Sequence, residues 1–214
     1  MIQYIHNEDI AHADVNIIIN ASNGIGWMGG TEGIGRKLKG VAESIHFASK
    51  GEVEKIAKKM CRKRNIFGLK PTSIFVTGAP NLKASSIMHC VTMRYPGSKT
   101  NFKTVKILVD KICSIMDKTT DFSIKTNSNL FTVAIPFLGC GTGGVDKELV
   151  RKLYEEKFKD RPEMFYIYEY SKTENNGQSI LEKRKYGENV MTEKEINKQE
   201  KSLLAKQTYG KNKE

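Results

Sequence analysis

The chain has 214 residues, of which 39% are hydrophobic and 28% are charged, and it carries a formal net charge of +11. This length suits one domain with an appendage and excludes two full-sized domains. No apolar run reaches the roughly 18–20 residues of a membrane-spanning helix, and the first residues lack the pattern of a secretory signal, so we expect neither feature.

The four cysteines, Cys61, Cys90, Cys113 and Cys140, lie far apart in the sequence and form no CxxC pair. This spacing argues against a zinc ribbon and against a thioredoxin-type redox site. We therefore expect reduced thiols and a cytoplasmic location, and the sequence calls for neither a metal nor a cofactor.

Apolar patterning predicts strands and helices that alternate along the chain. Runs rich in β-branched residues predict strands over residues 2–5, 15–21, 73–77, 86–91, 130–138 and 164–170. Apolar residues at helical spacing predict helices over residues 52–63 and 103–116, and Asp146 is a candidate N-cap of a third helix. The alternation indicates an α/β fold with a mixed or largely parallel sheet covered by helices.

Basic residues concentrate at residues 55–64 and 99–106, and such runs usually form the solvated face of a helix. The positive charge also allows attraction to a polyanion or to a small anionic ligand. After residue 170 large apolar residues become scarce, while Lys, Glu, Asn and Gln dominate. We expect one domain over residues 1–170 and a charged, mobile or partly helical extension over residues 171–214.

Two glycine-rich loops follow predicted strands, at residues 20–33 and 136–146. Glycine has no Cβ, so successive backbone N–H groups can approach a phosphate and form an anion-binding concavity. The second loop also opens a helix, whose N-terminus favours negative charge. We interpret the two loops as gripping one diphosphate from both sides.

Each loop contains a G-x-G-x-x-G pattern, which is weak evidence on its own. A dinucleotide-binding site needs an acidic residue at the end of the next strand, about 20 residues further on. After the first loop that distance falls near Gly51, where a helix is predicted, and after the second loop one strand remains. The pattern therefore does not favour a nicotinamide-dependent oxidoreductase.

Six segments, in order, resemble the macrodomain family of ADP-ribose-binding modules. They are Asn7-Glu-Asp-Ile10, Val15–Asn23 (VNIIINASN), Gly29-Gly30, Thr77-Gly-Ala-Pro-Asn-Leu82, Ile87-Met-His-Cys-Val91 and Ile135-Pro-Phe-Leu-Gly-Cys-Gly-Thr142. The resemblance covers residues 1–170 and implies a three-layer α/β/α fold with a mixed sheet of about six strands. It also implies ADP-ribose, or a molecule carrying it, as the ligand.

The resemblance implies roles for residues near the adenine and the two riboses. Asp9 would accept a hydrogen bond from the adenine amine, assisted by the backbone of Ile10, and Tyr168 would stack on the base. Asn23 would bind the distal ribose, and Asn20 of the same segment is counted with the ligand-binding residues. Asp9 could instead cap a turn, and the two asparagines could bond only the loop backbone.

The diphosphate would be held by backbone groups. Gly29 and Gly30 would pass close to it, and the second loop would offer the N–H groups of Gly139, Cys140, Gly141 and Thr142. Gly143 stands where the family often carries an aromatic residue. Cys140 is interpreted as a small residue in a tight loop rather than a nucleophile, and His89 as a core histidine.

The sequence departs from the family pattern at the positions that matter for catalysis. Thr31 replaces a third glycine, and Glu32 and Gly33 occupy the neighbourhood where hydrolytic members often carry an aspartate. Two functions therefore stay open: binding of ADP-ribose, or hydrolysis of an ADP-ribosyl linkage or of ADP-ribose-1″-phosphate, with Asn23 orienting the ribose and Glu32 or a substrate phosphate activating water. A basic nucleic-acid-binding protein is the third candidate.

Overall fold

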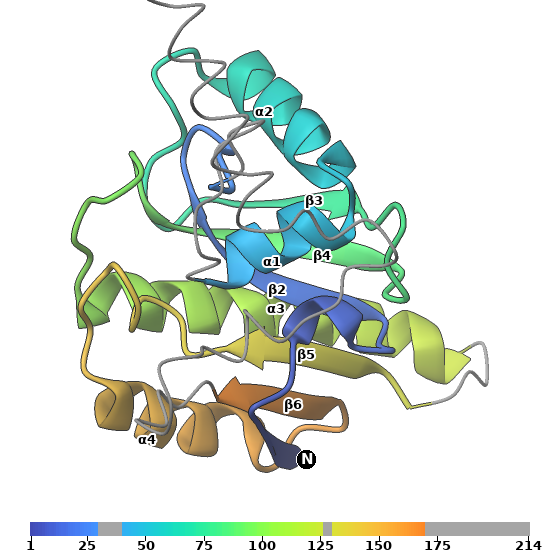
Figure 1. Cartoon of the computed structure of the whole chain (residues 1–214). Coiled ribbons are helices and arrows are strands. Elements are labelled where there is room, and N and C mark those ends of the chain that lie inside the picture. Colours follow the sequence, from blue (N-terminus) through green and yellow to red (C-terminus); the bar gives the residue numbers. More distant parts are fainter. Residues whose placement is uncertain (30–39, 126–129, 170–214) are drawn as a thin grey trace, which may run out of the picture.

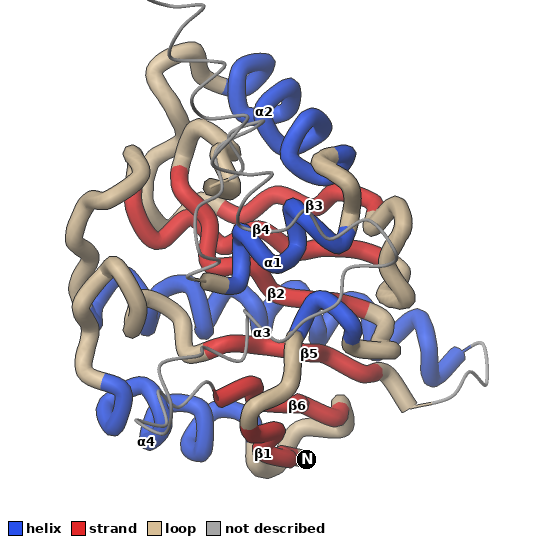
Figure 2. Tube along the Cα trace, viewed as in Figure 1, coloured by secondary structure: helices blue, strands red, loops and turns tan. Residues whose placement is uncertain are grey.

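The computed structural model describes residues 1–29, 40–125 and 130–169, and these form one α/β unit (Figures 1 and 2). Six strands make one sheet in the order β1-β6-β5-β2-β4-β3. Neighbouring strands run parallel except β3, which is antiparallel to β4. The strands are β1 (Ile2–His6), β2 (Ile17–Asn23), β3 (Ile74–Gly78), β4 (Ser86–Met93), β5 (Thr132–Pro136) and β6 (Met164–Glu169).

Helices cover both faces of this sheet. In the described ranges they are η1 (Ile10–His12, a 3₁₀ helix), α1 (Val41–Ala48), α2 (Glu52–Arg64), α3 (Phe102–Lys125) and α4 (Lys147–Phe158). In Figure 1, α1 lies in front of the sheet and α3 behind it. The architecture is therefore three-layered, with helices, a mixed sheet and helices again.

The core is divided by the sheet because side chains alternate along a strand. In β2, Ile17 and Ile19 pack with α3 and α4, whereas Ile18 packs with η1 and α1. A third group, under α2, contains Ala57 and Phe75. Strands buried on both faces read as continuous apolar runs, which is why β2 and β4 were recognisable in the sequence.

The predicted fold class is confirmed, and each predicted strand and helix is present with shifted ends. The strand expected over residues 130–138 is shorter, because Phe137 and Leu138 already leave the sheet toward the loop that follows. The prediction missed η1 and α1. Helix α1 has eight residues and begins at Val41, and its N-cap Gly40 has no side chain to give a capping signal.

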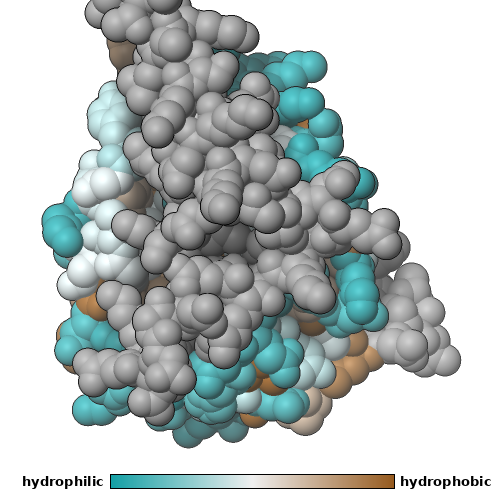
Figure 3. All heavy atoms as spheres, viewed as in Figure 1, coloured by the Kyte–Doolittle hydropathy of each residue, from teal (hydrophilic) through white to brown (hydrophobic). Residues whose placement is uncertain are grey.

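The basic run at residues 55–64 forms the solvated side of α2, as predicted. Lys55, Lys59, Arg62 and Lys63 are exposed, while Ala57 and Cys61 face the core. The hydrophilic surface at the upper right of Figure 3 belongs to this helix. Among the described residues, none of the helices combines the length and apolar character needed to cross a membrane. The expected extension over residues 171–214 lies outside the described ranges.

Candidate functional site at the carboxyl edge of the sheet

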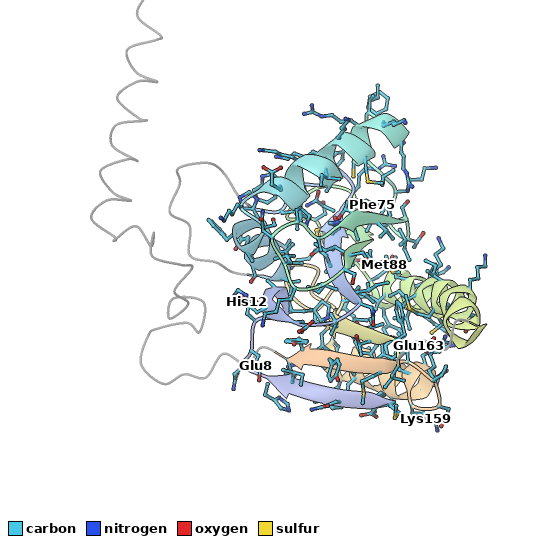
Figure 4. The ribbon with its side chains drawn as sticks, turned by 90° about the vertical axis from the view of Figure 1, so that its right-hand side faces the viewer. Glu8, His12, Phe75, Met88, Lys159 and Glu163 are labelled. Atoms are coloured by element: carbon cyan, nitrogen blue, oxygen red, sulfur yellow. The ribbon has the colours of Figure 1, made fainter. Side chains whose placement is uncertain are left out.

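The segments singled out in the sequence meet at one edge of the sheet. Strands β2 and β5 are adjacent and parallel, so the loops after them leave from the same edge. Strands β1 and β6 are parallel to β5 as well, which brings the segment after β1 to that edge. Figure 4 shows this arrangement: Glu8 and His12, after β1, lie at the opposite edge from Lys159 and Glu163, before β6. Ligands of open α/β sheets bind at such carboxyl edges.

The glycine-containing part of the second loop, residues 139–144, is held by the segment that follows β4. Thr100 donates its backbone N–H to the carbonyl of Gly143 at 3.1 Å, and the Lys99 ammonium donates to the carbonyl of Thr142 at 3.2 Å. A Cβ on Gly143 would lie 2.5 Å from the carbonyl oxygen of Gly139, and Gly139 has a φ of 76°. Glycine is therefore required at both positions by the loop itself.

The centre of this loop is open. Gly141 and Thr142 are exposed, and a Cβ on Gly141 would meet no atom within 4 Å. Within the described part of the chain, the N–H groups of Gly141, Thr142 and Gly143 have no protein acceptor. The Cys140 N–H differs, because it donates to the carbonyl of Phe137 at 3.3 Å. An anion would therefore meet residues 141–143 rather than Cys140.

The Cys140 thiol is not an activated nucleophile. Its Sγ lies 3.6 Å from the carbonyl oxygen of Leu138, and the partly buried Cys140 side chain packs against the hydrophobic core. Burial raises the pKa of this thiol to about 11, outweighing the nearby Lys147. At neutral pH the thiol is protonated, which agrees with its interpretation as a small loop residue.

The described glycines of the first loop pack against the protein's own chain. A Cβ on Gly24 would lie 2.1 Å from the carbonyl oxygen of Leu69, and one on Gly26 would lie 2.7 Å from the backbone of Ala57. Gly29, with a φ of 90°, lies against the Glu43 side chain. Their spacing therefore reflects tight contacts with α1, α2 and the segment before β3.

Asn23 closes the first loop on itself. Its Oδ1 accepts hydrogen bonds from the N–H groups of Ile25 and Trp27, at 3.2 and 3.1 Å, and its Nδ2 donates to the carbonyl of Trp27 at 2.5 Å. An amide nitrogen carries two hydrogens, and within the described part of the chain only one of those on Asn23 has an acceptor. The side chain thus combines loop closure with a remaining donor.

Asp9 and Tyr168 lie near each other beside η1. The Asp9 carboxylate caps η1 by accepting from the Ala11 N–H at 3.0 Å, and the Ser44 hydroxyl of α1 donates to it at 2.5 Å. Burial, and then the negative charges of Glu8 and Asp9, raise the pKa of the Tyr168 hydroxyl to about 12. The half-buried Tyr168 ring offers a surface on which a base can stack, and the Asp9 carboxylate can accept a hydrogen bond from an amino group of that base.

Ile10 and Asn20 are both buried, at 3% and 0% exposure. Asn20 Nδ2 donates to Nδ1 of His89 at 3.2 Å, so Nε2 carries the proton and donates to the Thr77 hydroxyl at 3.0 Å. Burial lowers the pKa of His89 to about 3, and its ring stacks on Phe75. His89 is thus a core histidine, as interpreted, and the Asn20 side chain is buried beside it.

Gly30, Thr31, Glu32, Gly33 and Tyr170 lie outside the described residues. Sequence reasoning also missed residues that shape the site, namely Ser44, Lys99 and Thr100. Each is an ordinary polar residue far in sequence from the loop or carboxylate it contacts. A pattern search along one segment gives no signal for such contacts.

Comparison with known proteins places this architecture in a family. The family model for the Macro domain matches residues 19–154, which include both glycine-rich loops. The chain belongs to the macrodomain family. An uncharacterized protein of Aquifex aeolicus is 30% identical to this macrodomain over 154 residues, which is 72% of this chain and 79% of that protein.

Solved structures agree with the fold of this macrodomain. The macrodomain of Mycobacterium tuberculosis DarG matches with a TM-score of 0.61 and 22% identity, over 80% of this chain and 99% of that one. An Oceanobacillus iheyensis macrodomain with ADP matches with a TM-score of 0.59 and 16% identity, over 93% and 90%. Thermosipho africanus DarTG in complex with ADP-ribose matches with a TM-score of 0.55 and 18% identity, over 74% and 39%.

Proposed function

We propose that this macrodomain binds ADP-ribose at the carboxyl edge of its sheet. The observation that carries the proposal is the second loop. Gly141 and Thr142 are exposed at its centre, the N–H groups of residues 141–143 have no acceptor among the described residues, and the loop lies beside the one that follows β2. Successive N–H groups of this kind favour a phosphate. Membership of the macrodomain family and the similar structures determined with ADP or ADP-ribose support the choice of ligand.

The positions of the residues suggest how the ligand lies along the edge. Asp9 and Tyr168 lie at the β1–β6 side, the second loop follows β5, and Asn23 is the last residue of β2. We assign adenine to Asp9 and Tyr168, the diphosphate to residues 141–143, and the distal ribose to Asn23 and Gly29. The ligand would then cross β6, β5 and β2 in the order of its own groups.

Hydrolysis is the reaction that this placement supports, because the distal ribose carries the linkage in an ADP-ribosylated molecule. Water would form a bond to C1″ while the bond from C1″ to the acceptor breaks, and the acceptor atom would leave with the electron pair and take up a proton. Asn23 would orient the ribose, with Glu32 or a substrate phosphate activating the water. Release of ADP-ribose from ADP-ribosylated protein and nucleic acid, and of phosphate from ADP-ribose-1″-phosphate, tests this activity.

Isothermal titration calorimetry with ADP-ribose and AMP tests the binding proposal. AMP lacks the second phosphate and the distal ribose, so it should bind at least about tenfold more weakly, the loss of roughly one hydrogen bond to a charged group. Equal affinity for the two would contradict the proposed site. A parallel titration with a single-stranded oligonucleotide at two salt concentrations tests the nucleic-acid alternative, because binding to phosphates weakens steeply with salt.

A further inference from the structure

A buried carboxylate lies behind the first loop, and the sequence analysis gave it no role. Glu54 belongs to α2, and its side chain is 5% exposed. Its Oε2 accepts a hydrogen bond from the N–H of Met28 at 3.3 Å and lies 2.7 Å from Nδ1 of His46. Its Oε1 pairs with the ammonium of Lys58. One carboxylate thus connects the first loop to both α1 and α2.

The surroundings keep this carboxylate charged. Burial alone would raise the pKa of Glu54, but the contacts with His46 and Lys58 outweigh burial and hold the pKa below its usual range. A buried carboxylate without such partners would be costly. An ionised acceptor binds an N–H more strongly than a neutral one, so the charge on Glu54 strengthens its 3.3 Å contact with the Met28 N–H.

Met28 is the place where the loop needs an attachment. Asn23 closes the loop only as far as Trp27. Beyond it, the Met28 side chain is 1% exposed in the core, and Gly29 lies in a left-handed conformation against α1. Glu54 therefore holds the peptide that joins Trp27 to Met28, and the core holds the Met28 side chain just before Gly29.

We propose that Glu54 is a positioning residue that sets the first loop for the distal half of the ligand. The proposal rests on the proposed function, because it assigns the distal ribose to Asn23 and Gly29. It predicts a selective effect. Adenine and the first phosphate are assigned to other elements, so loss of Glu54 weakens ADP-ribose and leaves AMP unchanged.

A merely structural role predicts a different result. If Glu54 only joins α1 to α2, its loss lowers the melting temperature and weakens both ligands together, or neither. The ratio of the two affinities is therefore the decisive quantity. It is insensitive to the fraction of folded protein, because both ligands report on the same folded molecules.

The experiment compares Glu54→Leu, which has a similar volume and no acceptor, with Glu54→Gln, which keeps an acceptor oxygen. Glu52→Gln is the matched control, since Glu52 is a solvent-facing carboxylate of the same helix, paired with Lys55. We expect Glu54→Leu to weaken ADP-ribose about tenfold or more, as for an unmade bond of a buried group. Glu54→Gln should fall between it and wild type, and AMP should bind all variants equally.

Amide hydrogen exchange gives a readout that needs no ligand. The Met28 amide should exchange faster in Glu54→Leu than in wild type and stay unchanged in Glu52→Gln. If Glu54→Leu does not fold, Lys58→Met, which removes one partner of the carboxylate, should shift the ADP-ribose to AMP ratio in the same direction by a smaller factor. An unchanged ratio in the folded variants overturns the inference. A wild-type protein that binds no ADP-ribose overturns the proposed function instead, and Met28 exchange then still decides whether Glu54 holds the loop.

Discussion

Replacement of Gly141 by valine separates the ligand-binding role of the second loop from its folding. Gly139 and Gly143 are poor probes, because added side chains there would strain or collide with the loop. Gly141 is different: its φ lies outside the left-handed region, and a Cβ would enter open space. Gly141→Val should therefore fold normally while placing a branched side chain over the exposed centre of the loop.

The size of the effect follows from the hydrogen bonds lost. A bond to a charged group is worth about 1.5–3 kcal/mol, and the valine should prevent at least two of those offered by residues 141–143. The loss of binding free energy is then roughly 3–6 kcal/mol, which weakens ADP-ribose binding a hundredfold or more. At the upper end, about four orders of magnitude, a micromolar dissociation constant rises beyond the millimolar range.

Calorimetry with ADP-ribose measures this loss, and circular dichroism and thermal melting establish that the variant is folded. Gly78→Val is the matched control, because a Cβ there also meets no atom within 4 Å. Gly78 ends the antiparallel strand β3 and so lies at the other edge of the sheet. A folded Gly141→Val protein that binds ADP-ribose as wild type does would refute the assignment of the diphosphate to this loop.

Three other predictions follow from the remaining residues. Asp9→Ala should reduce the preference for ADP-ribose over its inosine analogue. It should also lower the free energy of unfolding by about 1 kcal/mol, because the carboxylate caps η1. A loss of stability with an unchanged preference would show that Asp9 does not contact the base. Between pH 6.5 and about 3, His89 takes up a proton in the unfolded state but stays neutral in the buried, folded state. This residue therefore lowers the free energy of unfolding by about 1.4 kcal/mol for each pH unit of acidification. In His89→Gln, the dependence of the free energy of unfolding on pH, measured by denaturation, should be shallower by that amount. Cys140→Ala should bind ADP-ribose within about twofold of wild type, and the Cys140 thiol should react slowly with iodoacetamide at pH 7; fast labelling would contradict the raised pKa of the thiol.

The central strands β2, β4 and β5 could be predicted because they are buried on both faces. The segment Val15–Asn23 contains the run Ile17-Ile18-Ile19, and such β-branched residues favour a buried strand. Helix α1 could not be predicted in the same way. It is short, has a glycine as its N-cap and buries Ser44 and Ile45, so both its capping and its apolar pattern are weak.

Part of the candidate site could also be predicted from the sequence and part could not. The second loop was recognisable, because its glycines serve a local function and stand together in the sequence. In the first loop, the sequence did not reveal why Gly24 and Gly26 are glycines. A Cβ on either would collide with the backbone of Leu69 or Ala57, which lie more than 30 residues further along the chain. Glu54 gave no signal at all, because a glutamate in a basic helix is ordinary until folding buries it.

The central claim is that ADP-ribose binds across the two loops, and an amide chemical-shift titration tests it most directly. Uniformly ¹⁵N-labelled protein is titrated with ADP-ribose, and the shifted amides are mapped on the structure. The account predicts saturable shifts concentrated at residues 139–144 and 23–29, with a further group at Asp9 and Tyr168. Saturable shifts confined to the exposed basic side of α2, or none at either loop, would contradict it.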